Sequence, residues 1–247
     1  MLRIENLSKS FEGFAALRQV SLALAVGQTH ALIGPNGAGK TTFFNLITGH
    51  SKPDAGRVEF EGRTITGLAP HRIVRLGLAR SFQRINIYPR LSVRENIQVA
   101  LIAQARQHFK LFLPGKRLHL EEAGALLEVV GLAAVAGEVA GELAYGRQKQ
   151  LELAIALASR PRLLLLDEPT AGMSPQETSA AMELVLRIVR ECGLTLFFTE
   201  HDMSVVFGMA ERISVLHHGQ LIASGTPAEV QRDPEVRRVY LGGMQDA

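Results

Sequence analysis

The residues best suited to chemistry lie in a glycine-rich run near the start of the chain. The stretch from Gly34 to Thr41 fits the pattern G-x-x-x-x-G-K-[ST], in which successive backbone N–H groups form a nest for phosphate oxygens. Lys40 can reach the β- and γ-phosphates of a nucleotide, and the Thr41 hydroxyl can ligate Mg²⁺. The motif requires a strand before the loop and a helix after it, and an apolar run at 31–33 and a helical pattern at 41–48 supply them. The alternative, a glycine-rich surface turn, would not need these elements. The expected nucleotide contacts are Gly34, Pro35, Asn36, Gly37, Ala38, Gly39, Lys40, Thr41 and Thr42.

Two acidic residues follow a second apolar run. Leu163 to Leu166 are four consecutive leucines, as in a parallel strand buried on both faces, and Asp167 and Glu168 come directly after them. Ligands bind at the carboxyl ends of the strands in open α/β sheets. Asp167 is therefore placed to hold Mg²⁺ and Glu168 to polarise an attacking water, although two adjacent acids could also be a solvated strand end.

Two further groups could touch a nucleotide. His201 follows an apolar strand, and a histidine at that end can contact a γ-phosphate, whereas a lone histidine is more often structural. Phe11 and Phe14 lie in the predicted loop 10–14, where an exposed ring could stack on adenine. The alternative is that both rings belong to the core. His217 and His218 are interpreted as turn residues.

Strand and helix patterns alternate around these groups. Apolar and polar residues alternate at 2–4 and at 20–26, and Ser174 to Glu177 has the capping residues of a helix that should stop at Gly193. Further strands are expected at 56–62, 78–82, 194–199 and 213–216, a helix at 146–159, and two short helices from 226 and 233. Gln83 directly follows the predicted strand at 78–82, so we expect it to lie in the same region as the acidic pair.

From about residue 84 the pattern becomes helical. Ser92 to Glu95 has the form of a capping box, and a second amphipathic stretch carries Leu120, Ala123, Leu126, Leu127 and Val130 on one face before Gly131. Residues 84–119 hold seven basic residues against Glu95 alone, a net charge of +6. The basic, apolar segment 109–117 suits a surface near anionic headgroups or a membrane partner, or its apolar residues fill a helical core. A helical insert of this kind predicts a subdomain.

Composition limits the classes of protein that fit. The chain has 247 residues, 47% apolar and 21% charged, as in an ordinary soluble globular protein. No run approaches the roughly eighteen apolar residues of a membrane span, and the first residues lack the apolar core of a signal peptide, so export is not expected. Cys192 is the single cysteine, which excludes an internal disulfide and suits a reducing cytoplasm. The net charge of +3 is too small to indicate nucleic acid.

Together these residues resemble the ATP-binding subunits of ABC transporters over nearly the whole chain. Gly34 to Thr42 matches the phosphate loop, Gln83 the Q-loop glutamine, and Phe11 the adenine-stacking aromatic. Asp167 and Glu168 match the Mg²⁺ aspartate and the catalytic glutamate, and His201 matches the switch histidine. The signature sequence is matched by Leu143, Ala144, Tyr145 and Gly146, and the D-loop by 171–174. The resemblance implies that catalysis depends on Glu168, His201 and Gln83, that Mg²⁺ is held by Thr41, Gln83 and Asp167, and that the phosphate loop, the signature residues and Phe11 contact ATP.

Two departures from the family pattern are informative. The usual signature is Leu-Ser-Gly-Gly-Gln, so Ala144 occupies the serine position and Tyr145 that of the first glycine. Ser174 occupies the D-loop aspartate position. The Leu-Ala-Tyr-Gly variant and the terminal run 240–243 are similar to the branched-chain amino-acid importer branch, and urea or amide importers look similar as well.

The resemblance implies an α/β fold in one domain, 1–247. A P-loop NTPase core with a mainly parallel sheet flanked by helices would comprise 1–83 and 159–247, including an N-terminal antiparallel β portion. An inserted α-helical subdomain, 84–158, would carry the signature. In the family, two such subunits sandwich two ATPs head to tail and drive transmembrane subunits.

The implied function is an ATPase that powers uptake of branched-chain amino acids from the cytoplasmic face of the membrane, as a peripheral subunit. Its partners would be a second ATP-binding subunit, expected to be a different chain, two transmembrane permease subunits and, indirectly, a periplasmic or extracellular solute-binding protein, with no nucleic acid. The alternatives are uptake of another small polar solute such as urea or an amide, a soluble ABC-type ATPase acting on ribosomes or DNA, and a nucleotide switch without useful hydrolysis. The single phosphate loop and the lack of sustained heptads favour transport over the ribosome or DNA alternative.

Overall fold

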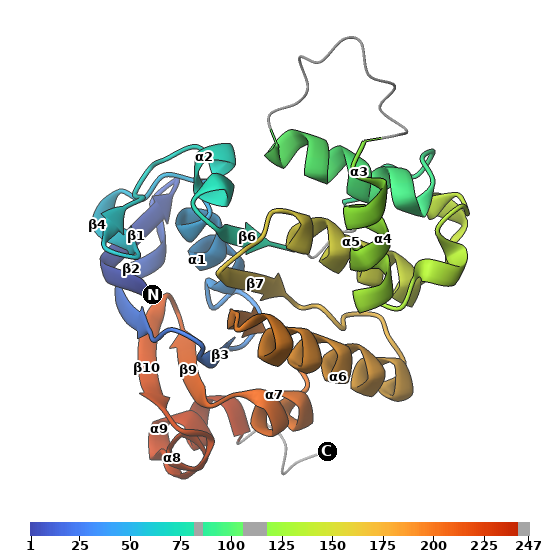
Figure 1. Ribbon diagram of the computed structural model, residues 1–247. Helices are drawn as coiled ribbons and strands as arrows, with labels where there is room; N and C mark the ends of the chain where they lie inside the picture. The colour runs from blue at the N-terminus through green and yellow to red at the C-terminus, as the bar shows by residue number, and fades with distance from the viewer. Residues whose placement is uncertain (82–85, 106–117, 242–247) are drawn as a thin grey trace.

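Figure 1 shows a computed structural model of the chain, which describes residues 1–81, 86–105 and 118–241. Gln83, the basic segment 109–117 and the terminal glycines at 242–243 lie outside the described residues. The strands are β1 (Leu2–Phe11), β2 (Phe14–Leu24), β3 (Thr29–Ile33), β4 (Ala55–Phe60), β5 (Arg63–Thr64), β6 (Leu78–Arg80), β7 (Leu163–Asp167), β8 (Thr195–Thr199), β9 (Arg212–His217) and β10 (Gln220–Gly225). The helices are α1 (Lys40–Ile47), α2 (Pro70–Arg75), α3 (Val93–Gln104), α4 (Leu120–Val129), α5 (Tyr145–Ala158), α6 (Pro175–Cys192), α7 (Met203–Met209), α8 (Pro227–Arg232) and α9 (Pro234–Val236). Short 3-10 turns lie at Ala133–Val135 and Ala140–Glu142, and a π-helical turn at Arg237–Leu241.

The central sheet brings the predicted chemical groups to one edge. Over the described residues its strand order is β10-β9-β3-β8-β7-β6, with parallel pairing from β9 to β6 and an antiparallel pair at β9–β10. The register sets Asp167 of β7 opposite Thr199 of β8. Since β3, β7 and β8 are parallel, the phosphate loop, the acidic pair and His201 all leave the sheet at the same edge.

The packing on both faces of β7 explains why it carries four leucines before Asp167. Leu164 and Leu166 belong to an apolar cluster that includes residues of α3 to α9, whereas Leu163 and Leu165 belong to a second cluster with α1 and the N-terminal sheet. Successive side chains of a strand point to opposite faces, so both faces of β7 are covered. The expected mainly parallel sheet flanked by helices is confirmed (Figure 1).

The N-terminal antiparallel portion is also confirmed, as a sheet of order β2-β1-β4-β5 in the described residues. Val26 was expected in its second strand, but β2 ends at Leu24 and Val26 is 73% exposed in the following turn. The predicted loop 10–14 is in fact a tight hairpin with the two-residue turn Glu12-Gly13, both at positive φ. Phe11 and Phe14 are 48% and 67% exposed, so the interpretation of these rings as core residues is wrong.

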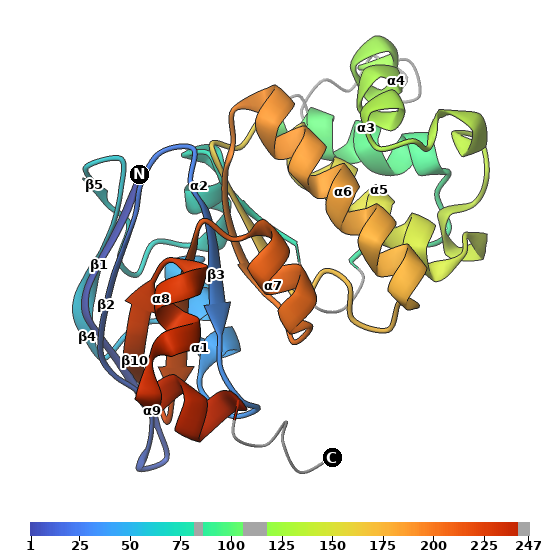
Figure 2. The same ribbon diagram turned by 90° about the horizontal axis from the view of Figure 1, so that it is seen from below.

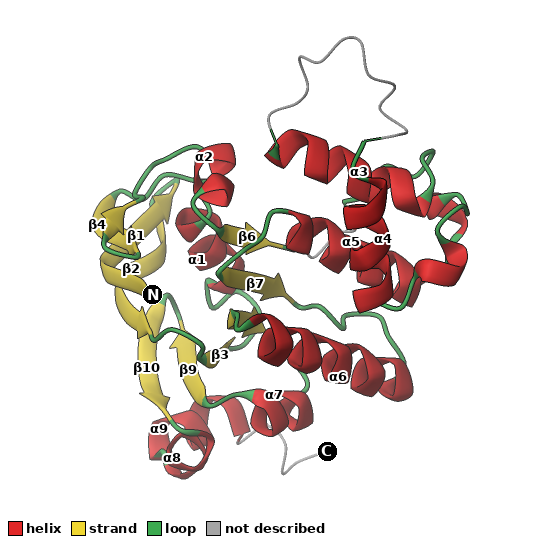
Figure 3. Cartoon of the chain, viewed as in Figure 1, coloured by secondary structure: helices red, strands yellow, loops and turns green. Residues whose placement is uncertain are grey.

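Helices α3, α4 and α5 gather at one end of the molecule (Figures 2 and 3). The capping boxes predicted at Ser92 and Ser174 are both present, and Gly193 ends α6 at a φ of +62°. Leu120 was expected on the buried face of α4, but it is 43% exposed. One apolar cluster joins α3, α4 and α5 to the central sheet, so the boundaries of the 84–158 subdomain stay a prediction. In the described ranges, every helix falls short of the length and hydropathy that a membrane crossing requires.

Candidate nucleotide-binding site

The run 34–42 forms the turn between β3 and α1, as predicted. Gly39 precedes α1 with a φ of +106°, where a side chain would be strained, and a Cβ there would lie 2.7 Å from the Ala16 carbonyl oxygen. A Cβ on Gly34 would lie 2.1 Å from the Leu216 carbonyl oxygen. The two glycines are therefore required by the close packing of the loop against β2 and β9.

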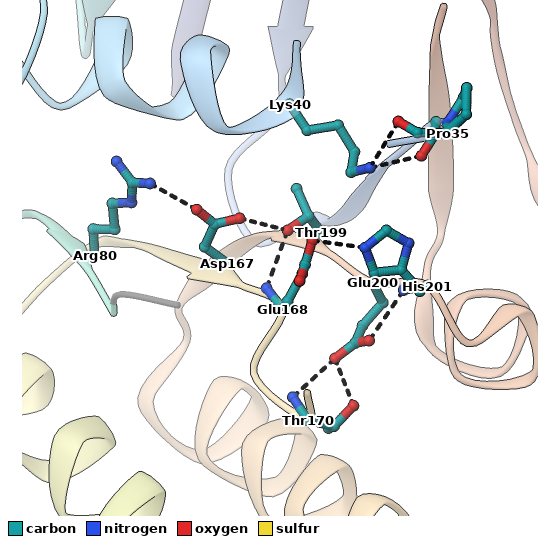
Figure 4. A network of polar contacts seen from close by, with 10 residues as sticks. Pro35, Lys40, Arg80, Asp167, Glu168, Thr170, Thr199, Glu200 and His201 are labelled. Carbon is teal, nitrogen blue, oxygen red and sulfur yellow. Dashed lines mark hydrogen bonds and ion pairs between the residues drawn. The ribbon is translucent and has the colours of Figure 1, made fainter. Parts of the chain in front are cut away.

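Lys40 is buried at the start of α1 and is held by its own loop. Its Nζ donates to the carbonyl oxygens of Gly34 at 2.6 Å and Pro35 at 3.3 Å (Figure 4). Burial lowers the pKa of Lys40, and the nearby carboxylates of Glu168 and Asp167 oppose that shift. The ammonium group thus already faces the loop interior, where phosphate oxygens could replace the two carbonyl oxygens.

Asp167 ends β7 as a buried carboxylate that accepts from two sides. Its Oδ2 accepts from Arg80 Nη2 at 2.7 Å, and its Oδ1 accepts from the Thr199 hydroxyl at 2.8 Å. Both partners come from neighbouring strands of the parallel sheet, β6 and β8. The carboxylate is consequently fixed before any ligand arrives.

Glu168 leaves the sheet in an unusual backbone conformation. Its φ is +50°, a left-handed value that costs a non-glycine residue on the order of 1–3 kcal/mol. Its N–H donates to the backbone carbonyl of Thr199, which stabilises this conformation. The side chain is turned toward His201, whose Nε2 lies 2.7 Å from Glu168 Oε1 (Figure 4). The carboxylate and the imidazole therefore form one hydrogen-bonded pair at the open edge of the sheet.

A buried glutamate holds the segments that follow β7 and β8 together. Glu200 Oε1 accepts from the Thr170 N–H at 3.0 Å and from the Thr170 hydroxyl at 2.7 Å. Glu200 Oε2 accepts from the His201 N–H at 3.1 Å. These bonds position His201 relative to the turn after Glu168. No sequence motif indicates a role for Arg80, Thr170, Thr199 or Glu200. Each is only a polar residue in or beside an apolar strand.

The structure brings most of the predicted site residues together; Gln83, the signature residues and Phe11 are the exceptions. The phosphate loop, Asp167, Glu168 and His201 share one edge of the sheet, and Gln83 lies outside the described residues. The signature residues Leu143, Ala144, Tyr145 and Gly146 lie at the start of α5. There they neighbour the D-loop region of the same chain, since a Cβ on Gly172 would lie 3.8 Å from the Tyr145 ring. Phe11 lies at the β1–β2 hairpin.

Two family models match stretches of this chain. The family model described as ABC transporter matches residues 17–171, and that of the branched-chain amino acid ATP-binding cassette transporter matches residues 220–245. The first match includes the phosphate loop and the acidic pair. Phe11 and His201 lie outside both matched stretches, and their roles stay predictions from the resemblance described above.

Curated relatives match along almost the entire chain. The high-affinity branched-chain amino acid transport ATP-binding protein BraF of Pseudomonas aeruginosa is 38% identical over 252 residues, covering 98% of each chain. The corresponding protein LivG of Salmonella typhimurium is 38% identical over 249 residues, again covering 98% of each chain.

Solved structures of ATP-binding cassettes match as well. The crystal structure of the ADP conformation of MJ1267, an ATP-binding cassette of an ABC transporter, superposes with a TM-score of 0.87 at 33% identity and 98% coverage of each chain. The dimeric post-hydrolysis state of the cassette MJ0796, bound to ADP and phosphate, superposes with a TM-score of 0.78 at 26% identity, covering 92% of this chain and 99% of that one. The chain therefore belongs to the ABC transporter family, as a nucleotide-binding subunit that hydrolyses ATP.

Proposed function

We propose that this chain powers the uptake of branched-chain amino acids through separate membrane-spanning subunits. The observation that carries this proposal is the 38% identity to BraF and LivG along 98% of the chain, together with the C-terminal match at 220–245. The signature variant Leu143-Ala144-Tyr145-Gly146 supports the same branch of the family.

The phosphate loop, in this proposal, holds the ATP triphosphate. Lys40 exchanges the carbonyl oxygens of Gly34 and Pro35 for β- and γ-phosphate oxygens. Thr41 and Asp167 would hold Mg²⁺, since hydroxyl and carboxylate oxygens are the hard ligands that this ion prefers. The resemblance to the family adds Gln83 as a third Mg²⁺ ligand. When bound, the ion neutralises the charge that builds up on the phosphates.

Glu168 acts as the group that orients and activates the attacking water. Its strained backbone points the carboxylate toward the open edge of the sheet, and the 2.7 Å bond to His201 fixes its direction. His201 then faces the place of the γ-phosphate, held there through Glu200. Positioning of this kind supplies most of the acceleration in phosphoryl transfer.

The signature acts on the ATP of a second cassette. Ala144 is the N-cap residue of α5 and makes no side-chain capping bond to the first N–H groups of this helix, which could donate to an anion. Phe11 stacks on adenine in its own subunit. We further propose a peripheral position on the cytoplasmic face of the membrane, with two permease subunits and a solute-binding protein as partners.

Transport by a strain that lacks this chain tests the proposed cargo. Uptake of radiolabelled leucine, isoleucine and valine should be lost in this strain and restored by the wild-type chain but not by Lys40→Ala, which cannot hold the triphosphate. Uptake of urea and acetamide serves as the matched control and should not change. Loss of urea or acetamide uptake with normal leucine uptake would reassign the cargo.

A further inference from the structure

Arg80 is a buried arginine that joins three elements beside the acidic pair. It is the last residue of β6, and its side chain is only 5% exposed. Nη2 donates to Asp167 Oδ2 at 2.7 Å on β7. Nη1 donates to Asn45 Oδ1 at 2.7 Å and to the Thr48 hydroxyl at 3.2 Å, both on the α1 side. The guanidinium group also lies over the Phe44 ring, 5.6 Å from its centroid.

The contacts on α1 follow one face of that helix. Asn45 is four residues after Thr41 and Thr48 is seven after it, so the three side chains lie on the same side of α1. Thr41 is exposed at the phosphate-loop end of this face. Arg80 therefore connects the face that carries the Thr41 hydroxyl to the Asp167 carboxylate.

We propose that Arg80 is a positioning residue that fixes the spacing between Thr41 and Asp167 and thereby sets the Mg²⁺ affinity of the site. This inference rests on the proposed function, in which Thr41 and Asp167 hold the ion. An arginine suits the task because its planar guanidinium presents donors on two separate nitrogens, whereas a lysine presents a single point charge. A mere counter-ion for Asp167 would not need the contacts to Asn45 and Thr48.

A second arginine, whose side chain is 57% exposed, provides a control with similar contacts. Arg162 forms an ion pair with Glu61 at 2.6 Å, donates to the Leu76 carbonyl at 2.7 Å and lies over the Phe60 ring at 5.7 Å. Its partners thus resemble those of Arg80 in kind, but they belong to the N-terminal sheet and the α2–β6 connection, away from the phosphate loop.

The test measures Mg²⁺-dependent nucleotide binding rather than turnover. Each substitution is made in the full-length Glu168→Gln protein, which should bind ATP without hydrolysing it, and a fluorescent ATP analogue is titrated in EDTA and then with increasing Mg²⁺. Arg80→Lys and Arg80→Gln should both raise the Mg²⁺ concentration for half-saturation about tenfold, the scale of one hydrogen bond to a charged group. Affinity in EDTA should stay within about twofold, since Lys40 and the loop are untouched. Asn45→Ala should shift Mg²⁺ half-saturation in the same direction as Arg80→Lys, and Arg162→Lys should not shift it.

Three outcomes would overturn the inference. Normal Mg²⁺ half-saturation in Arg80→Lys, with a shift in Arg80→Gln, would mean that charge alone matters. A lowered Tm with unchanged Mg²⁺ half-saturation in both variants would make Arg80 a structural residue. If the Arg80 variants fail to fold, an unchanged response in Asn45→Ala overturns the inference. Failure of the proposed function would look different, because Thr41→Ala and Asp167→Asn would then leave the Mg²⁺ response unchanged.

Discussion

Glu168 has the side chain and the surroundings that water activation needs. It follows the fixed Asp167 directly, and His201 holds its carboxylate at 2.7 Å. Glu168→Gln keeps the size of the side chain but replaces a carboxylate acceptor with an amide. Hydrolysis by the assembled transporter should fall by roughly 100-fold or more, the range for removing a general base, while ATP still binds. Stopped turnover with retained nucleotide, measured by phosphate release and by filter binding, is the expected result.

Lys40→Ala is the matched comparison for Glu168→Gln. It should abolish hydrolysis at an earlier step, because the triphosphate loses the ammonium that now bonds to Gly34 and Pro35. The two variants should thus have opposite nucleotide occupancy at similarly low turnover. Near-normal hydrolysis by a well-folded Glu168→Gln protein would move the catalytic role elsewhere, with His201 as the next candidate.

Phe11 is the residue to test for adenine binding. Its ring is half exposed at the hairpin, and the return strand of that hairpin packs on the phosphate loop at Gly39. Phe11→Ala should weaken ATP binding about tenfold or more, since base–aromatic stacking contributes roughly 1–3 kcal/mol. Phe14→Ala is the control and should weaken binding less. If titrations of two folded variants reverse this order, Phe14 is the stacking residue.

At the scale of the element, β3 carries a buried histidine that should make stability depend on pH. His30 Nε2 lies 2.9 Å from the Ser214 hydroxyl, and its ring packs edge-on against Phe197. Burial, aided by the positive charge of Arg212, lowers the pKa of His30 from 6.5 to about 4. Between these values the unfolded chain binds more protons than the folded one, so the free energy of unfolding should fall as pH drops from about 6.5 toward 4.

The expected slope from His30 is about 1.4 kcal/mol per pH unit within that window. Urea unfolding at pH 7 and pH 5 measures it. His30→Asn should remove this part of the pH dependence, although it also lowers stability at pH 7 by disturbing the packing. His71→Asn changes an exposed histidine and should keep the wild-type dependence. An equal pH dependence in wild type and His30→Asn would contradict the assignment.

The elements that sequence reasoning found are those with local signals. The structure confirms the helix caps at Ser92 and Ser174 and the apolar strand β7. The sequence signals for all three involve only neighbouring residues. The helices α2 and α7 and the strand β10 were not predicted. Each has only six or seven residues, too few for a clear apolar period, so tertiary packing decides their conformation.

The same distinction holds for the site as a whole. Asp167 and Glu168 could be predicted because they are adjacent in the sequence and follow a buried strand. The bonds from Arg80 to Asn45 and from Glu200 to Thr170 could not, since they span 35 and 30 residues and depend on strand register and helix orientation. The residues expected to contact the nucleotide thus follow local motifs, whereas the residues that position them depend on the assembled fold.

For the whole molecule, the departures in the signature and D-loop predict an unequal pair of cassettes. Ala144 has no hydroxyl to offer a γ-phosphate. Ser174 is engaged within its own chain, where its hydroxyl lies 2.8 Å from Glu177 Oε2 and caps α6. A homodimer would carry both departures at each of its two ATP sites. We therefore expect the native partner to be a different ATP-binding chain.

ATPase activity measured with and without that partner tests this expectation. The chain purified alone should hydrolyse ATP slowly, and its turnover should rise when the second cassette and the permease subunits are added. Ala144→Ser should raise the activity of the chain alone, because it restores a hydroxyl donor at the start of α5. Ser174→Asp, which keeps a capping oxygen for α6, tests the D-loop position in the same way. A homodimer as active alone as in the full assembly would show that neither departure limits turnover, and the two ATP sites would then be equivalent.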